Sequence, residues 1–173
     1  MTDYKTYGEG RHESADRSEL RRILGPQWKI QDEVWGRGPD GKPVRVDAVI
    51  RPIDATQWKD PSVAFAVECK SMTRQKQICD RSHWLRQCVD YTYTNWQGYG
   101  FLWVLTFPSV FGPWYTKSSI EHERHLFGAF GVGEIVNDRW GGWSIHFSTH
   151  RIWSEKQGVV SGSRWTCKKT FGA

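Results

Sequence analysis

Apolar residues near the start of the chain recur at the spacing of a helix. Leu20, Ile23 and Leu24 fall on one face when they are placed on the period of about 3.6 residues that defines an α-helix. Ser14 precedes this stripe and is suited to cap a helix N-terminus, and Gly25-Pro26 follows it as a stop signal. The pattern therefore predicts an amphipathic helix from Ser14 to Leu24.

The segments that follow carry the alternation of strands. From Val44 to Arg51 polar and apolar residues alternate almost throughout, and residues 28–35 alternate in part. The sequence GRGPDG at 36–41 lies between them and predicts a tight turn, so that the two strands form a hairpin. The other expected elements are a strand at 63–69, a helix at 76–95, a strand at 101–107, a helix at 119–130, and one or two strands within 143–153.

In chain order these elements read α-β-β-β-α-β, followed by a helix and further strands. Residues 63–69 and 101–107 are almost wholly apolar, which is typical of central strands buried on both faces. We therefore expect the α/β (α+β) class, with a single mixed β-sheet flanked by helices. The length of 173 residues suits one domain over 1–173, with a core at about 13–107 and a C-terminal extension at about 108–173.

The net charge and the apolar content limit the kinds of partner that the chain is expected to bind. The net charge of +5 suits a polyanion, because each phosphate that a cationic side chain neutralises releases counterions. Charge alone does not decide this, since many basic domains bind no nucleic acid. No apolar run approaches the ~20 residues that cross a bilayer, so no membrane partner is expected. Residues 1–10 are polar and lack the apolar stretch of a secretory signal, which favours the cytoplasm.

Cysteine and tryptophan add less specific information. The four cysteines form no C-x-x-C pair, so we expect reduced thiols rather than a zinc or redox site. Four of the eleven tryptophans lie in apolar surroundings and are expected in the core: Trp84, Trp96, Trp103 and Trp114. Four others lie among Gly, Ser and basic residues: Trp140, Trp143, Trp153 and Trp165. The second group suits base stacking or a protein interface, although simple packing is favoured for each one singly.

One combination of residues carries chemistry. Asp47 interrupts an apolar strand, and Glu68-Cys69-Lys70 ends another. Glu68 and Lys70 are two apart and project from one face of a strand. Two adjacent carboxylates repel each other unless a cation lies between them, and Mg²⁺ is often held by one or two carboxylates with waters. A bare E-x-K is common by chance and usually exposed, but here it ends a buried type of strand with an acid in the strand before it.

These residues resemble the active-site motif of the PD-(D/E)XK nuclease superfamily. Asp47 and Glu68-Cys69-Lys70 occur in the order of that motif, although Val46 stands where the motif has proline. Gln87 and Tyr91 in the next expected helix are similar to the Q-x-x-x-Y motif of RecB-like members, and their i, i+4 spacing puts them on one helix face. The resemblance covers about residues 13–107.

The resemblance implies a fold, a cofactor and a set of site residues. It implies a restriction-endonuclease-like core and a metal site for Mg²⁺, with Mn²⁺ as a substitute. Its metal ligands are Asp47, Glu68 and the carbonyl of Cys69, with an acid on the first helix as a further ligand or as a group that supports the ligands. Glu13 is the first candidate for that acid, followed by Asp16 and Glu19. Lys70 is implied to position the attacking water, and Gln87 and Tyr91 to support the site or contact DNA.

The resulting hypothesis is a Mg-dependent deoxyribonuclease that hydrolyses phosphodiester bonds. Phage or mobile-element DNA processing, or repair, is the setting by analogy, in the host cytoplasm if the chain is phage-encoded. Two alternatives stay open: a non-catalytic nucleic-acid-binding or virion-type assembly subunit, and an RNA-acting nuclease. A homodimer, or a protein partner bound through the Trp-rich C-terminal part, is also open. Four basic residues after the motif are expected to grip the DNA backbone or to be ordinary solvated helix residues: Arg74, Lys76, Arg81 and Arg86.

Overall fold

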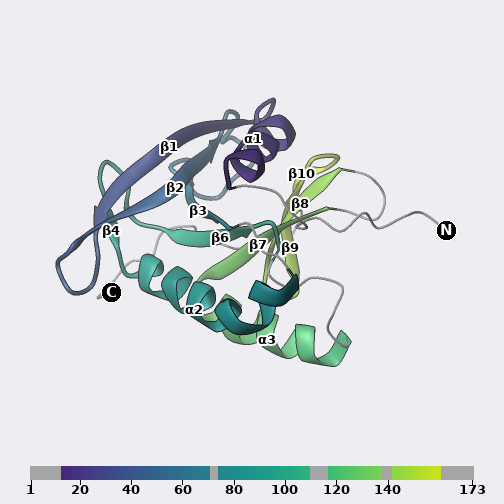
Figure 1. Ribbon diagram of the computed structural model, residues 1–173. Coiled ribbons are helices and arrows are strands. Elements are labelled where there is room, and N and C mark those ends of the chain that lie inside the picture. The colour runs from purple at the N-terminus through teal and green to yellow at the C-terminus, as the bar shows by residue number, and fades with distance from the viewer. Residues whose placement is uncertain (1–12, 71–73, 110–116, 138–141, 161–173) are drawn as a thin grey trace.

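The computed structural model describes residues 13–70, 74–109, 117–137 and 142–160 (Figure 1). The helices are α1 (Glu13–Leu24), α2 (Arg74–Thr92) and α3 (Lys117–Ala129). The longer strands are β1 (Trp28–Arg37), β2 (Pro43–Pro52), β3 (Phe65–Cys69), β6 (Trp103–Phe107), β7 (Val132–Asn137), β8 (Trp143–Phe147) and β9 (His150–Ser154). Three strands of two residues each complete the sheet: β4 (Asn95–Trp96), β5 (Gly100–Phe101) and β10 (Gly158–Val159).

All of these strands form one mixed sheet in the order β10-β9-β8-β7-β6-β3-β2-β1-β4-β5. The pairs β3–β6 and β6–β7 are parallel, and the other pairs are antiparallel. The parallel strands lie in the middle of the sheet, and β3 is buried along its whole length. Parallel strands are normally buried on both faces, because the elements that connect them pack over the sheet.

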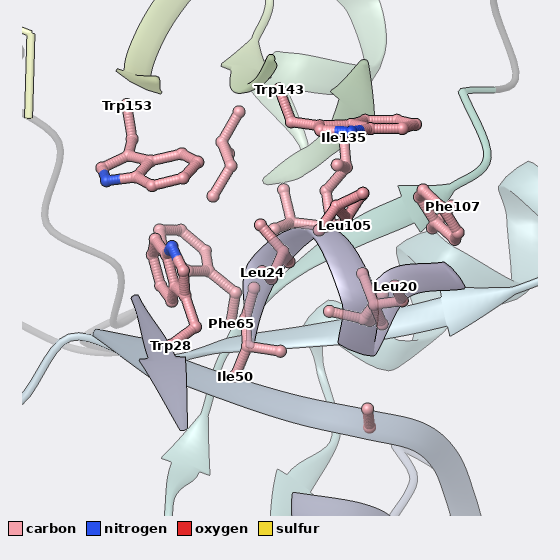
Figure 2. Packing of buried hydrophobic residues seen from close by; sticks show 14 of the residues in the cluster. Leu20, Leu24, Trp28, Ile50, Phe65, Leu105, Phe107, Ile135, Trp143 and Trp153 are labelled. Carbon is pink, nitrogen blue, oxygen red and sulfur yellow. The ribbon is translucent and has the colours of Figure 1, made fainter. Parts of the chain in front are cut away.

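Two hydrophobic cores lie on opposite faces of the sheet. Helix α2 covers one face, where Trp84, Leu85 and Cys88 pack against Val104 and other strand residues. Helix α3 lies on the same side as α2, below the sheet in Figure 1. Helix α1 covers the other face with its apolar stripe (Figure 2). The larger core around α1 contains Leu20, Ile23, Leu24, Trp28, Ile50, Phe65, Val67, Leu105, Phe107, Ile135, Ile145, Phe147, Ile152 and Trp153.

The sheet is strongly curled into a half-barrel, so the expected sheet flanked by helices in a restriction-endonuclease-like core is wrong. Strands β1 and β9 are separated by five strands in the sheet, yet the rings of Trp28 and Trp153 lie 5.2 Å apart, edge to face (Figure 2). Gln27 Nε2 also donates a hydrogen bond to the carbonyl of Glu155 at 3.2 Å. Large aromatic side chains, together with α1, fill the hollow that the curl creates.

The positions of the individual helices and strands agree with the sequence pattern better than the overall arrangement of the sheet does. The helices expected at 14–24, 76–95 and 119–130 and the strands expected up to 107 are present with small shifts of their ends. Residues 143–153 contain two strands, which is one of the two possibilities, one strand or two, that the sequence left open. Strand β7 was not expected. Its residues include Gly133, where an added Cβ would lie 2.5 Å from the carbonyl oxygen of His146, so the close approach of β8 requires glycine there.

The tryptophans in the described part of the C-terminal third pack inside the protein. Trp143 and Trp153 are buried in the core around α1, as simple packing predicts for each, and Trp84 and Trp96 are buried in the core beneath α2. Trp103 is only half-buried. Trp114, Trp140 and Trp165 lie outside the described residues. None of the helices in the described ranges is both long enough and apolar enough to span a membrane.

Candidate functional site

Asp47 and Glu68 meet where strands β2 and β3 separate. The last paired positions of the two strands are Ala48 and Val67, so the next step of the register sets Asp47 opposite Glu68. Beyond this point the strands are joined by a side chain, because the backbone N–H of Cys69 donates to Oδ2 of Asp47 at 2.8 Å. The expectation that Asp47 lies beside Glu68 is therefore consistent with the register.

Gln87 connects the residues of the E-x-K motif to helix α2. Its amide nitrogen donates to Oε1 of Glu68 at 3.1 Å, and its amide oxygen lies 3.5 Å from Nζ of Lys70, at the outer limit of a hydrogen bond. Glu68 and Lys70 thus converge on one side chain, as expected for two residues on one strand face. Lys70 lies directly after β3, and its backbone N–H donates to the carbonyl of Phe107 at 3.0 Å.

Tyr91 anchors Gln87 to the hairpin. Gln87 Nε2 donates to the Tyr91 hydroxyl at 2.7 Å, and that hydroxyl donates to the carbonyl of Arg45 at 3.0 Å. Burial raises the pKa of Tyr91 to about 12, and the negative charge of Glu68 acts in the same direction. The hydroxyl therefore keeps its proton at neutral pH and remains a donor. The resulting chain of hydrogen bonds runs from Glu68 on β3 through α2 to the backbone of β2.

Negative charge concentrates around Cys69. Burial raises the pKa of the Cys69 thiol far above its usual value, and the carboxylates of Asp47, Glu68 and Asp16 raise it further. The thiol therefore stays neutral, and a role for Cys69 at a metal falls to its backbone carbonyl. Asp47 and Glu68 supply hard oxygen donors, which suit Mg²⁺ or Mn²⁺ better than softer metals.

Three or more His, Cys, Asp or Glu side chains arranged to hold a metal ion do not occur together within residues 13–70, 74–109, 117–137 and 142–160. Mg²⁺ commonly takes only one or two carboxylates, with water and substrate phosphate as its other ligands. Asp47 and Glu68 fit that requirement. The Mg²⁺ site implied by the sequence accordingly stays a prediction.

Helix α1 brings Asp16, one of the three candidate acids, toward the site. Glu13 begins α1, but its side chain lies outside the described part of the chain. Asp16 is buried, and its charge acts on Cys69. Glu19 accepts two guanidinium hydrogen bonds from Arg22, and its side chain is 16% exposed. Asp16 follows the apolar stripe one turn before Leu20, and that spacing is the signal by which it can be ranked first.

The alternation of side chains between the two faces of the sheet is interrupted at Asp47. It is also interrupted at Glu33, which lies across the hairpin from Asp47. Val46 packs in the core beneath α2, whereas Ala48 packs in the core around α1. Glu33 has a φ of 51°, in the left-handed region that non-glycine residues seldom occupy. Regular pairing resumes on both sides of this point. A strict alternation from Val44 to Ile50 would not have predicted this break.

An arginine that the motif does not include lies close to Asp47, and a second arginine shares its other partner, Glu33. Arg17 of α1 lies 3.9 Å from Asp47 Oδ1 and 3.4 Å from Glu33 Oε1. Arg45 of β2 forms an ion pair with the same Glu33 oxygen at 3.2 Å. Neither arginine stands out in the sequence, because the hairpin and the packing of α1 bring them together. They give the acidic site a positively charged border.

A cleft of about 480 Å³ adjoins the site on the α2 side. It lies between α2 and the turn of the β1–β2 hairpin, and Gln87 and Tyr91 form part of its wall. Arg86 also lines it and is exposed. The side chains of the other three expected basic residues lie outside the described part of the chain: Arg74, Lys76 and Arg81.

A row of polar residues continues from Glu68 across the sheet. The registers pair Glu68 with Thr106, Thr106 with Glu134, and Glu134 with His146. Glu134 is almost fully buried, and it accepts hydrogen bonds from Arg124 of α3 and from Ser109. Burial raises its pKa despite the neighbouring guanidinium. This network ties α3 to the middle of the sheet.

Comparisons with protein-family models, with curated proteins and with solved structures gave no match for this chain.

Proposed function

We propose that this chain is a metal-dependent DNA nuclease whose active site contains Asp47, Glu68 and Lys70. The supporting observation is the convergence of Glu68, Lys70 and Tyr91 on Gln87, beside Asp47. These residues come from three separate segments of the chain, β2, the end of β3 and α2, and their order along the chain resembles the PD-(D/E)XK motif. The proposal takes the chemistry of that motif and does not depend on the fold class of the superfamily.

Phosphodiester hydrolysis forms a bond from a water oxygen to phosphorus and breaks the bond from phosphorus to the leaving sugar oxygen. The water loses a proton, and the leaving oxygen gains one. Lys70 is suited to orient the water and to stabilise the negative charge that builds up on the phosphate oxygens. Gln87 fixes the position of Glu68 and Lys70 relative to each other, and Tyr91 fixes Gln87.

Asp47 and Glu68 are the residues that would hold Mg²⁺ or Mn²⁺, with the carbonyl of Cys69 and the acid Asp16 as neighbours. A bound ion supplies Lewis-acid activation of water and neutralises phosphate charge. Arg17, Arg45 and Arg86 would contact the phosphates that flank the cleaved bond, because charge attraction to the backbone positions DNA without reading its sequence. The cytoplasm, and phage or mobile-element DNA, remain part of the proposed setting.

The deciding experiment compares the wild type with Lys70→Ala on linear, circular and single-stranded DNA, in Mg²⁺, Mn²⁺ or EDTA. We expect cutting by the wild type only with metal, and a loss of at least ~100-fold in Lys70→Ala, which is the size of effect that removal of one charge-stabilising group commonly has. Attack on circles identifies an endonuclease. Single-stranded RNA in a parallel reaction tests the RNA-acting alternative.

Lys29→Ala is the matched control. Lys29 is an exposed lysine on β1, so its loss changes the net charge by the same amount as the loss of Lys70 while leaving the site intact. We expect Lys29→Ala to cut at close to the wild-type rate. If the folded wild type cuts nothing in any metal, the nuclease proposal is wrong, and the binding or assembly subunit takes its place.

A further inference from the structure

Trp35 is exposed in a protein whose other described tryptophans are buried or half-buried. Its exposed fraction is 53%. The remaining large apolar side chains that the structure describes as exposed are not tryptophans: Ile53, Tyr93, Leu126 and Phe130. Packing explains most of the tryptophans of this chain, but it does not account for a ring on the surface of β1. A single exposed apolar side chain is common on protein surfaces, so the neighbours of this ring decide whether it can bind a ligand.

Arg45 lies against the ring of Trp35. Residues 35 and 45 are paired across the hairpin, and the guanidinium carbon lies 5.9 Å from the ring centre. Arg45 is itself held by Glu33 at 3.2 Å. An aromatic face beside a cationic fork is a combination that binds a base and its phosphate together, because the base stacks on the ring while the arginine attracts the phosphate.

This pair is connected to the proposed active site. Glu33 binds Arg17 as well as Arg45, and Arg17 lies 3.9 Å from Asp47. Arg45 and Asp47 are two residues apart on β2, which corresponds to about 6.6 Å along a strand. A strand of DNA advances at least about 3.4 Å per nucleotide, the stacked spacing of the B form, and further when it is unstacked and extended. A base on Trp35 would therefore lie about one to two nucleotide steps from a phosphate at Asp47.

We propose that Trp35 and Arg45 form a stacking platform for an unpaired DNA base next to the cleavage site. A single strand suits this surface better than a duplex, because the bases of a duplex already stack on each other and hide their faces. The platform extends the proposed function by naming its substrate class, DNA with a single-stranded segment. The position relative to the cut rests on the proposed function, whereas the binding does not.

Binding is measured in EDTA, where the proposed metal-dependent cutting cannot interfere. The probes are fluorescein-labelled oligothymidylate and a blunt duplex of equal length, followed by anisotropy at several salt concentrations. We expect Trp35→Ala to weaken oligothymidylate binding by about 5-fold to 100-fold, the range for loss of one base–aromatic stack. Trp35→Phe should retain most of the affinity. Duplex affinity should change by less than about 2-fold, since no unpaired base is lost.

Ile53→Ala is the matched control, because Ile53 is a similarly exposed apolar residue at the other end of the same hairpin. It should bind both probes as the wild type does. The melting temperature of each variant shows whether it is folded. Oligothymidylate with one abasic nucleotide, moved stepwise along the strand and cut in Mg²⁺, locates the stacked base. We expect one sensitive position about one to two nucleotides from the cut in the wild type, and none in Trp35→Ala.

The two proposals can fail separately. If folded Trp35→Ala binds oligothymidylate as tightly as the wild type, or loses duplex affinity to the same degree, the platform is wrong even if the protein cuts DNA. If the wild type never cuts but loses oligothymidylate affinity through Trp35→Ala, the platform stands and the nuclease proposal fails. Weak binding of oligothymidylate by the wild type itself, equal to that of Trp35→Ala, also overturns the platform.

Discussion

At the scale of single residues, the site depends on one amide group. Gln87 contacts Glu68 and Tyr91 through its nitrogen and faces Lys70 with its oxygen. A carboxylate at this position would have no donor for Glu68, and an apolar side chain would leave both charged residues without their common neighbour. The orientation of Glu68 and Lys70 thus depends on a residue that need not touch the substrate.

Tyr91→Phe tests the link from this amide to the hairpin. Loss of the hydrogen bond to the Arg45 carbonyl should lower the free energy of unfolding by about 1 kcal/mol at neutral pH. Tyr91 has a pKa of about 12 in the folded protein against 10.0 ordinarily, so the folded state keeps the proton longer. The stabilisation linked to this proton is complete below pH 10 and is lost as the pH rises toward 12.

Urea unfolding at neutral and alkaline pH measures this difference. From pH 10 to 12 the wild type should lose more stability than Tyr91→Phe, so that their difference shrinks. Tyr93→Phe, at an exposed tyrosine just after α2, provides the control and should follow the wild type. A constant difference across this range would show that Tyr91 titrates like an ordinary tyrosine.

At the scale of elements, the hairpin β1–β2 supports both proposals. Its first strand carries Trp35, and its second carries Arg45 and Asp47. The short strand β4 holds the hairpin from outside through Trp96, whose Cα pairs with that of Gly36. A Cβ at residue 36 would lie 2.7 Å from the Trp96 ring and 2.6 Å from Thr94. Glycine at this position therefore lets β4 pack closely against β1.

Gly36→Ala should therefore destabilise the protein by about 1 to 3 kcal/mol, the usual cost of an overpacked contact. Gly38→Ala is the matched control on the same hairpin. Its added Cβ would come no closer than 3.3 Å, to a flexible carboxylate of Asp40, so a much smaller effect is expected. Chemical unfolding followed by circular dichroism gives both values. Equal stability of the two variants would mean that β4 moves aside at little cost.

At the scale of the whole molecule, the curled sheet joins the N-terminal and C-terminal parts. The core around α1 contains Leu20 from the first helix and Ile152 from β9, both essentially inaccessible to solvent. The division into a core at about 13–107 and an extension does not separate two hydrophobic interiors. Strands β7, β8 and β9 line the same hollow as the first hairpin, so we expect one cooperative unit.

Leu20→Ala and Ile152→Ala test this expectation. Each should lower the unfolding free energy by about 2 to 5 kcal/mol, because each leaves a cavity in a buried cluster. Both should shift the same single transition, whether it is followed by tryptophan fluorescence or by circular dichroism. Two transitions, one sensitive to Leu20→Ala and the other to Ile152→Ala, would show that the C-terminal part folds on its own.

The sequence by itself determined the elements and the order of the site residues. Helical and strand periods depend on neighbouring residues, so the helices and most strands could be located from local spacing. The pairing of Glu68 with Lys70 follows from strand geometry, and that of Gln87 with Tyr91 follows from helix geometry. A spacing argument reaches no further than one element, and the short or glycine-containing strands β4, β5, β7 and β10 were not expected from it.

Tertiary structure alone decided the curl, the fold class and the border of the site. The contact of Trp28 with Trp153 depends on how seven strands twist and pack together, which no local period encodes. The contacts of Arg17 and Arg45 with Glu33 depend on how α1 docks on the sheet and on the left-handed backbone of Glu33. Such contacts join residues distant in sequence, and their energies depend on the packed whole.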